Sequence, residues 1–306
     1  MSEQSQTPSR NQNGASTSRK PTSAYRKLRR KLSKTKLRIP HIWLRHRGLT
    51  PGDVFFASYP RSGTTWSRFT LFEILHGRDS GFGAVNAEIC GIGKHKNATP
   101  VLPNNGRLIA THEQYRKEYK RAVYIVRDCR DVLLSEFTYT TNIEFFRGDL
   151  DEFVRTFFRG KVSPFAPWQR HITSWLDSPL AGTSNLMIVR YEDLRREPEE
   201  GFRRIVDYLG VSVSLERIRS AVANNALDKM KEKERMEPQR ASVKGRFVGS
   251  GVVQGWRSRL SPEQMQFVDE YAGTVLTRLG YPLSTQLGQE GVNLELKGSE
   301  LSPLRA

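Results

Sequence analysis

Four short apolar runs recur along the chain, and segments with helical periodicity lie between and after them. The runs cover residues 53–59, 107–112, 121–127 and 185–191. Their apolar residues are continuous rather than alternating, which is typical of parallel strands covered on both faces. The helical patterns fall at about 62–76, 129–140, 149–159, 165–177 and 198–209. Strands that alternate with helices predict an α/β fold, a doubly wound parallel sheet flanked by helices.

One more helix is signalled near the carboxyl end. The segment 261–281 (SPEQMQFVDEYAGTVLTRLGY) has a serine N-cap, a proline at the first helical position, a capping-box glutamine and a terminal glycine. The patterned region therefore predicts a single domain over residues 48–284. We expect it to lie between an N-terminal arm, residues 1–47, and a C-terminal tail, residues 285–306.

The predicted arm differs from the domain in composition and charge. Its first 24 residues are rich in Ser, Thr, Gln, Asn and Pro without apolar periodicity, which is typical of disorder. Twelve Lys and Arg residues and no acid lie between Arg19 and Arg47, so the rest of the chain carries only +5 of the formal charge of +17. Three interpretations of residues 25–47 stay open: a basic amphipathic helix on an anionic membrane or a nucleic acid, a solvated arm, and a transit peptide.

The chain contains only two cysteines, Cys90 and Cys129, which are too few for a disulfide framework or a four-cysteine zinc site. We therefore expect a reducing compartment and a cytoplasmic location, with residues 25–47 as the candidate contact to an anionic membrane. No apolar run reaches the roughly 18 residues of a membrane helix. No group of His, Cys, Asp and Glu has metal-ligand spacing, so we expect no metal.

The stretch SYPRSGTTW, residues 58–66, connects the first predicted strand to a helix. Gly63 leaves room for a ligand beside the backbone, and Arg61 adds a permanent charge with forked donors. The free N–H groups and the positive dipole end of a helix N-terminus also favour anions. Three hydroxyl side chains lie at the same turn: Ser62, Thr64 and Thr65. The stretch therefore predicts a phosphate or sulfate site; the alternative is an ordinary turn with a serine cap.

This loop is not a Walker A loop, which needs two glycines and a lysine before a Ser or Thr. It has one glycine, Gly63, and an arginine that precedes it. Trp66 follows directly. It could pack in the core with Phe69 and Leu75, or stack on a nucleotide base.

A second basic position stands where the third predicted strand ends. Arg127 ends the strand, Asp128 can cap the helix that follows, and Ser135 lies eight residues after Arg127. The carboxyl ends of parallel strands share one edge of the sheet, so Arg127 is expected near the first loop. The spacing alone leaves open whether Arg127 and Ser135 meet one anion or form a surface ion pair and a buried serine.

Together the two segments resemble the sulfotransferases that use 3′-phosphoadenosine 5′-phosphosulfate (PAPS). YPRSGTTW matches all eight positions of the family's first signature. The second signature, Val-Arg-Asx with a serine eight residues after the arginine, is matched by Arg127 and Ser135. The likeness runs from about Val54 to Tyr281. It implies a P-loop-like fold and a transferase that moves a sulfuryl group from PAPS to a hydroxyl or amine acceptor.

The resemblance also implies roles. The first loop would hold the 5′-phosphosulfate, with Arg61 in place of the usual lysine to stabilise charge on the leaving phosphate. Trp66 and Tyr191 would lie against the adenine. Arg127 and Ser135 would hold the 3′-phosphate. The full implied donor site is Arg61, Ser62, Gly63, Thr64, Thr65, Trp66, Arg127, Ser135, Tyr191, Ser250 and Gly251.

The family's third motif, Arg-Lys-Gly-x-x-Gly-Asp-Trp, is matched only in part. The chain reads GSGVVQGW over residues 249–256. Aligned on the tryptophan, Gly251 takes the place of the first glycine, Ser250 that of the lysine and Gly249 that of the arginine. The 3′-phosphate would therefore lack two cations. Three nearby basic residues are candidates to replace them: Lys244, Arg246 and Arg257.

Transfer to a hydroxyl also needs a general base near neutral pKa. His112 ends the predicted strand 107–112, at the same edge of the sheet. The family has its catalytic histidine there in the sequence Lys-Thr-His; the threonine and histidine match, and Ala110 replaces the lysine. His112 is the predicted base, Glu113 is the second candidate, and a structural histidine is the third interpretation.

Two other functions remain as alternatives. One is a nucleotide-dependent phosphotransferase, against which the missing Walker lysine counts. The other is a nucleic-acid-binding protein acting through the basic arm, although no recognised nucleic-acid motif is present and no specific nucleic acid is expected. The acceptor is not named by the sequence: a small molecule, a lipid or a glycan would fit. Segments 77–106 and 139–165 are expected to line its pocket.

Overall fold

The computed structural model describes residues 38–160, 162–237 and 248–287. The chain divides into two units, Met1–Arg45 and His46–Ala306, which are described separately. In the first unit the described residues belong to helix α2 (Arg38–His46), which ends one residue beyond it. The helical pattern expected from residue 25 falls mostly outside the described part of the chain.

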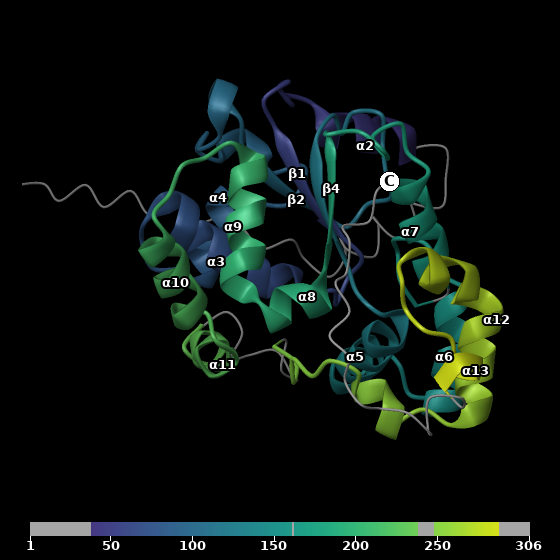
Figure 1. The fold of residues 1–306 in the computed structure, drawn as a ribbon. Helices are drawn as coiled ribbons and strands as arrows, with labels where there is room; N and C mark the ends of the chain where they lie inside the picture. The colour runs from purple at the N-terminus through teal and green to yellow at the C-terminus, as the bar shows by residue number, and fades with distance from the viewer. Residues whose placement is uncertain (1–37, 161, 238–247, 288–306) are drawn as a thin grey trace, which may run out of the picture. The chain divides into compact units, whose positions relative to one another are not determined.

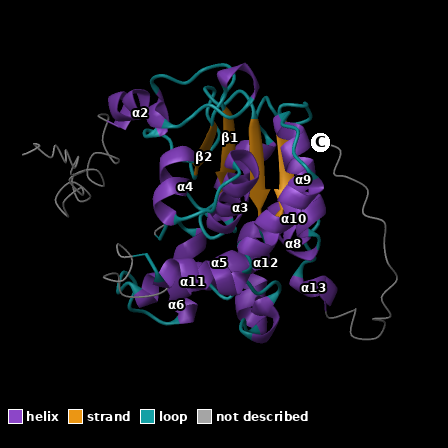
Figure 2. Ribbon diagram, turned by 90° about the vertical axis from the view of Figure 1, so that its left-hand side faces the viewer, coloured by secondary structure: helices purple, strands orange, loops and turns teal. Residues whose placement is uncertain are grey.

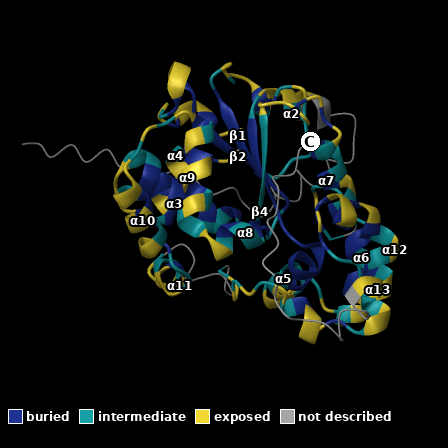
Figure 3. Cartoon of the chain, viewed as in Figure 1, coloured by how far each residue is buried: buried dark blue, intermediate teal, exposed yellow. Residues whose placement is uncertain are grey.

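The second unit is built on a parallel sheet. Within its described residues the strands are β1 (Val54–Ser58), β2 (Leu108–Thr111), β3 (Ala122–Val126) and β4 (Leu186–Arg190), in the order β2-β1-β3-β4 (Figure 1). All residues of β1, β2 and β3 are buried, as Figure 3 shows, whereas those of the edge strand β4 are half-buried. The other edge strand, β2, is covered by residues 90–92, which hydrogen-bond to it at Ala110. The predicted doubly wound α/β fold is confirmed.

Helices cover both faces of this sheet (Figure 2). The helices among the described residues of this unit are α3 (Thr64–His76), α4 (Phe82–Glu88), α5 (Cys129–Asn142), α6 (Leu150–Phe158), α7 (Trp168–Leu176), α8 (Tyr191–Arg196), α9 (Pro198–Leu209), α10 (Leu215–Asn224), α11 (Leu227–Arg235), α12 (Pro262–Arg278) and α13 (Ser284–Leu287), with 3-10 turns at His95–Asn97, Pro103–Asn105 and Gly255–Ser258. None of the helices in the described ranges is long and apolar enough to cross a bilayer.

Alternate residues of β1 serve two separate cores. Phe55 packs with α5, α6, α7 and α12, and Phe56 packs with α3, α4, α9 and α10 on the opposite face. Successive side chains of a strand point to opposite faces, so a continuous apolar run is what a sheet covered twice requires. The capping box predicted for α12 is present: Gln264 N–H donates to Ser261 Oγ, and Ser261 N–H donates to Gln264 Oε1.

The strand order determines where a ligand can bind. From β1 the chain crosses to β2 on one side, and β3 lies on the other side of β1. The connections therefore leave the carboxyl ends of β1 and β3 in opposite directions, which opens a crevice between them. SYPRSGTTW and Arg127 follow these two strands, so both stand at this crevice.

Candidate active site

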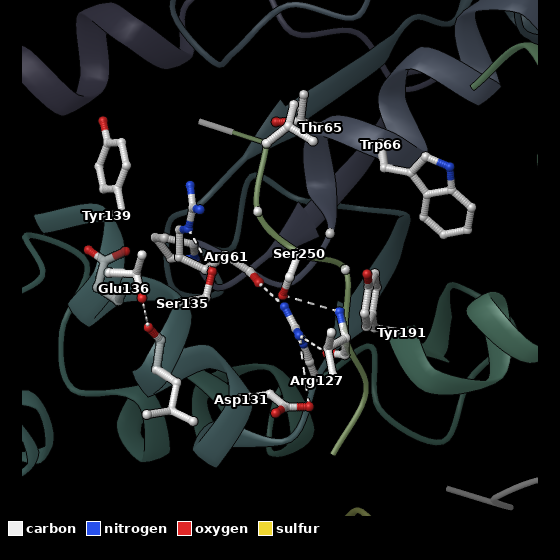
Figure 4. Close-up of a pocket in the computed structure, with 18 of the residues that line it drawn as sticks. Arg61, Thr65, Trp66, Arg127, Asp131, Ser135, Glu136, Tyr139, Tyr191 and Ser250 are labelled. Carbon is white, nitrogen blue, oxygen red and sulfur yellow. Dashed lines mark hydrogen bonds and ion pairs between the residues drawn. The ribbon is translucent and has the colours of Figure 1, made fainter. Parts of the chain in front are cut away.

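A cavity of about 1170 Å³ lies at the carboxyl edge of the sheet. Figure 4 shows it with side chains from the loops after β1 and β3, from α3, α5 and α8, and from the C-terminal segment 248–258. Of the residues predicted from the sequence, those that line it are Arg61, Gly63, Thr64, Thr65, Trp66, His112, Arg127, Ser135, Tyr191, Ser250 and Gly251. Residues from distant parts of the chain thus converge on one site.

The loop after β1 turns through two left-handed residues, Arg61 with φ 67° and Gly63 with φ 88°. Gly63 is the N-cap of α3, and no side chain caps this helix end. The first N–H groups of α3 therefore keep their capacity to bind an anion, with the helix dipole behind them. The serine cap of the alternative interpretation is absent, and the anion-binding interpretation of the loop agrees with this geometry.

Gly63 is needed for a second reason, which the sequence did not indicate. A Cβ atom at this position would lie 2.4 Å from Cδ2 of Tyr191, the first residue of α8. Tyr191 therefore packs directly on the loop. Its ring also lies 4.5 Å from the Arg127 guanidinium carbon and meets the Trp66 ring edge-on at 6.2 Å.

Ser62 is placed differently from its neighbours Thr64 and Thr65. Its side chain is fully buried, and its hydroxyl has no hydrogen-bond partner in the structure. Its N–H donates to Tyr59 O at 3.3 Å. Ser62 does not line the cavity, so the geometry does not support a direct contact of its hydroxyl with the anion, and its role stays a prediction. Thr64 and Thr65 do line the cavity, and Thr64 Oγ1 also contacts Ser58 Oγ at 2.5 Å.

Arg61 reaches across the cavity to α5. Its Nε donates to Ser135 Oγ at 3.1 Å, and its guanidinium carbon lies 4.8 Å from the Tyr139 ring centroid (Figure 4). Burial lowers the pKa of Arg61, and the nearby Glu136 carboxyl acts against this, but a guanidinium stays protonated at physiological pH. Arg61, implied to hold the 5′-phosphosulfate, thus contacts Ser135, implied to hold the 3′-phosphate.

Arg127 connects three segments of the site. Its Nη1 donates to Arg61 O at 3.0 Å and its Nη2 to Val252 O at 2.9 Å, and its guanidinium faces Tyr191. The Asp131 carboxylate lies 3.8 Å from Nη2. Arg127 is buried, so it is not part of a surface ion pair. It stands at the centre of the cavity wall, as the prediction required.

Asp131 fixes the C-terminal segment 248–258 against α5. Its carboxylate accepts hydrogen bonds from Gln254 N–H at 2.8 Å and Trp256 N–H at 3.3 Å. Burial raises the pKa of Asp131, and the Arg127 charge acts against this. Asp131 was not predicted as a site residue, because its partners in this segment are known only from the fold.

The glycines of segment 248–258 lie close to cationic side chains. A Cβ at Gly249 would be 3.9 Å from both Arg61 Nη2 and Ser135 Oγ, and a Cβ at Gly251 would be 3.8 Å from Arg195 Nη2. Gly251 has φ 68°, which favours glycine. Ser250 Oγ accepts from Val252 N–H at 3.4 Å.

The three basic residues suggested as replacement cations have different outcomes. Lys244 and Arg246 lie outside the described residues. Arg257 stacks on the Trp256 ring at 5.0 Å, its Nε donates to Gln254 Oε1 at 3.0 Å, and it lines a separate pocket of about 470 Å³. Arg257 therefore does not supply the missing charge in this structure.

His112 is held with one ring nitrogen toward the backbone of β1. Its Nδ1 lies 2.9 Å from Ser58 O. A carbonyl oxygen only accepts, so Nδ1 carries the proton and the lone pair of the neutral ring is on Nε2. Burial lowers the pKa of His112, the hydrogen bond to Ser58 acts against this, and the charges of Arg68 and Arg61 lower it further. The ring is thus neutral near pH 7, as a general base must be.

Glu113 is placed differently. Its N–H donates to Thr111 Oγ1 at 3.1 Å, its carbonyl oxygen accepts from Trp175 Nε1 at 3.1 Å, and it does not line the cavity. Of the two candidate bases, His112 is therefore the one that the geometry favours.

A second histidine, His171 on α7, supports His112 from behind. Its Nε2 donates to His112 O at 3.1 Å, and its Nδ1 accepts from Tyr124 OH at 2.9 Å. Burial lowers the pKa of His171 to about 3, so this ring stays neutral. The sequence offered no motif around His171, and only the packing of α7 on β3 indicates its role.

Comparison with known proteins agrees with this geometry. Residues 51–280 match the family model described as sulfotransferase domain. The chain belongs to the sulfotransferase family. The resemblance and the predicted activity, sulfuryl transfer from PAPS, are thereby confirmed at the level of the family, in preference to a phosphotransferase.

Relatives of this sulfotransferase are distant in sequence. Cytosolic sulfotransferase 13 of Arabidopsis thaliana is 25% identical over 252 residues, 74% of this chain and 77% of the relative. Sulfotransferase 1A1 of Rattus norvegicus is 27% identical over 207 residues, 60% and 68% of the two chains. A solved retinol dehydratase in complex with androsterone and inactive cofactor PAP has a TM-score of 0.61 at 21% identity, covering 76% of this chain and 83% of that chain. The likeness to the retinol dehydratase structure shows that the two proteins share a fold.

The rest of the sulfotransferase cavity was predicted only in part. Further lining residues are Glu136, Tyr139, Asn142, Ser163, Pro164 and Phe165, of which Phe165 lies beside His112. They fall within 139–165 or beside it, so this segment lines the cavity as expected. No residue of 77–106 does: Phe82 of α4 packs against Phe69 of α3 at 4.8 Å, and residues 90–92 hydrogen-bond to β2 at Ala110. Lining residues that the sequence did not indicate include Arg195, Leu227, Met230, Lys231 and Arg259.

Proposed function

We propose that this sulfotransferase uses Arg61 and the α3 N-terminus to hold the transferring end of PAPS and His112 to deprotonate a hydroxyl or amine acceptor. The observation that carries the proposal is the meeting of both in one cavity at the switch point of the sheet. When bound, PAPS supplies the sulfuryl group and a leaving phosphate. The chain positions the two substrates, supplies the positive charge of Arg61 and supplies His112 as the base.

The donor end fits the loop between β1 and α3. The α3 N-terminus has no side-chain cap, and Gly63 brings its backbone to the surface of the cavity. Sulfuryl transfer resembles phosphoryl transfer in that little covalent help is needed, so fixed positive charge at the leaving oxygen dominates the rate. Arg61 is placed to supply this charge.

The other end of the donor is assigned to Arg127, Ser135, Trp66 and Tyr191. The guanidinium donors of Arg127 rest on two backbone carbonyls, and a phosphate dianion accepts such donors more strongly than a neutral carbonyl does. Trp66 is half-buried, and its ring Nε1 has no partner in the structure. A purine beside Trp66 would fill the cavity there. Ser250 and Gly251 border the same region.

His112 is assigned as the base because its lone pair on Nε2 has no hydrogen-bond partner among the described residues while the ring lines the cavity. Proton abstraction by a positioned imidazole contributes about 10²- to 10⁴-fold to a rate. His171 fixes the backbone at His112 and so limits the directions in which the ring can point.

The acceptor is proposed to be a small molecule with a hydroxyl or amine. A lipid or a glycan is the alternative acceptor. Contact with an anionic membrane through residues 25–47 and a cytoplasmic location stay predictions. A relative of known structure holds androsterone, which supports a small acceptor. The acceptor side of the cavity combines Phe165, 5.7 Å from the His112 ring, with the polar groups of Glu136, Tyr139 and Asn142.

Calorimetry and turnover test the proposal together. The chain should bind adenosine 3′,5′-bisphosphate in the presence of EDTA, and Mg-ATP should not compete. His112→Ala should keep this binding within about threefold and lose at least 100-fold in turnover with a phenol or alcohol acceptor. Binding of Mg-ATP alone would reject the donor, and near-normal turnover of the variant would reject the base.

A further inference from the structure

Arg195 is a cation in the donor cavity that no hydrogen bond or ion pair among the described residues engages. It lies on α8, is half-buried, and lines the cavity. Its neighbours are engaged differently: Arg190 and Arg196 lie 4.0 Å and 3.1 Å from the Asp193 carboxylate. Arg195 contacts an aromatic ring instead, with its guanidinium carbon 5.2 Å from the Trp66 centroid.

The position of Arg195 relative to segment 248–258 distinguishes it from the other cations. A Cβ at Gly251 would lie 3.8 Å from Arg195 Nη2, and a Cβ at Gly249 would lie 3.9 Å from Ser135 Oγ. Gly249, Ser250 and Gly251 thus run from the Arg61–Ser135 pair to Arg195. An anion over this backbone, and beside Ser250, would lie between Ser135 and Arg195. Lys231 and Arg259 also line the cavity, but both are exposed.

We propose that Arg195 binds the 3′-phosphate of the donor and replaces charge that segment 248–258 lacks. The inference rests on the proposed function. A guanidinium presents five donors in a planar fork that suits a phosphate, and packing beside an indole orients this fork. The Trp66 contact therefore positions Arg195 between the adenine and phosphate subsites. The competing account is that Arg195 only packs on Trp66.

The two accounts differ in what they predict for ligands with and without a 3′-phosphate. The full chain, as wild type, Arg195→Gln and Arg196→Gln, is titrated by calorimetry with adenosine 3′,5′-bisphosphate and with adenosine 5′-monophosphate at one ionic strength. Arg196 is the matched control, because it is the adjacent arginine and its partners are Asp193 and Glu197, outside the donor cavity.

Arg195→Gln should weaken the bisphosphate about 10- to 100-fold and change the monophosphate less than threefold. Arg196→Gln should change neither more than threefold, and Arg195→Lys should recover part of the bisphosphate affinity. Since monophosphate binding reports a folded adenine site, a folding defect in Arg195→Gln would be seen there.

Equal weakening of both ligands by Arg195→Gln would show that Arg195 acts on the adenine site, through Trp66 or through folding, and would overturn the inference. Unchanged bisphosphate affinity would overturn it too, above all if Lys231→Gln showed the selective loss instead. If the wild type bound no bisphosphate at all, the proposed function would fail, and this inference with it. The inference alone fails when the wild type binds the bisphosphate and Arg195→Gln shows no selective loss of bisphosphate affinity.

Discussion

Replacing Gly63 by alanine should both destabilise the protein and weaken donor binding. Gly63 has φ 88°, and an alanine in this left-handed region costs roughly 1–2 kcal/mol. The added Cβ would also lie 2.4 Å from Cδ2 of Tyr191, closer than any van der Waals contact, so the tyrosine ring must move. Both penalties act at the same turn.

Movement of Tyr191 disrupts two contacts. The ring lies 4.5 Å from the Arg127 guanidinium carbon and 6.2 Å from the Trp66 centroid. A cation–π contact and an aromatic pair are worth roughly 0.5–1 kcal/mol each. Together with the backbone penalty, Gly63→Ala should cost about 2–4 kcal/mol in the free energy of unfolding. Affinity for adenosine 3′,5′-bisphosphate should fall at least tenfold, because Trp66 and Arg127 lose their shared neighbour.

Urea unfolding and calorimetry measure these effects, and Gly83→Ala is the matched control. Gly83 lies within α4, and a Cβ there would meet no atom within 4 Å, so this alanine should stabilise by about 0.5–1 kcal/mol. In Tyr191→Ala the clash is removed, and adding Gly63→Ala to it should cost only the backbone penalty of roughly 1–2 kcal/mol. If Gly63→Ala were as stable as Gly83→Ala, or if its cost were the same with and without the Tyr191 ring, the reasoning would be refuted.

Three further predictions concern histidine and arginine. Because burial lowers the pKa of His112, kcat/KM should decline only below pH 6.5, and a decline centred at pH 7 or above would contradict the neutral base. His171 has a pKa of about 3, so protons favour the unfolded state and stability should drop by about 2 kcal/mol from pH 7 to pH 5. His171→Asn should reduce this drop in urea titrations, and an unchanged pH dependence would exclude His171 as its cause. Arg61→Ala should lose about 10³-fold in single-turnover rate and Arg61→Lys less, since the lysine keeps the charge but not the Nε bond to Ser135; wild-type rates in Arg61→Ala would reject the loop assignment.

The fold could be predicted because its central strands have an unambiguous pattern. Phe55 and Phe56 are both buried, one on each face, and only a sheet covered on both sides buries successive residues in this way. Two of the helices that were not predicted show the limits of periodicity. Helix α8 has six residues, too few for an apolar repeat to show, and α10 buries only Ile218 and Ala221, so its apolar pattern is short.

Site residues could be predicted where they follow a strand directly. Arg61, His112 and Arg127 each come within three residues of the end of β1, β2 or β3. Parallel strands end at one edge of the sheet, so the strand topology brings these side chains together independently of how the helices pack. The strand ends therefore carry the part of the site that a sequence can specify locally.

Residues supplied by helices could not be predicted in this way, because their position depends on packing. The reason for Gly63 is the Tyr191 ring at the start of α8, and the reason for the His112 orientation includes His171 on α7. Arg195 has the same origin: it reaches the donor cavity because α8 turns directly from β4 with Trp66 as its neighbour. If Arg195 binds the 3′-phosphate as proposed, a helix that no motif connects with segment 248–258 supplies charge that this segment lacks. The positive charge available to the 3′-phosphate would then depend on how α8 packs, and the motif in segment 248–258 alone does not specify that packing.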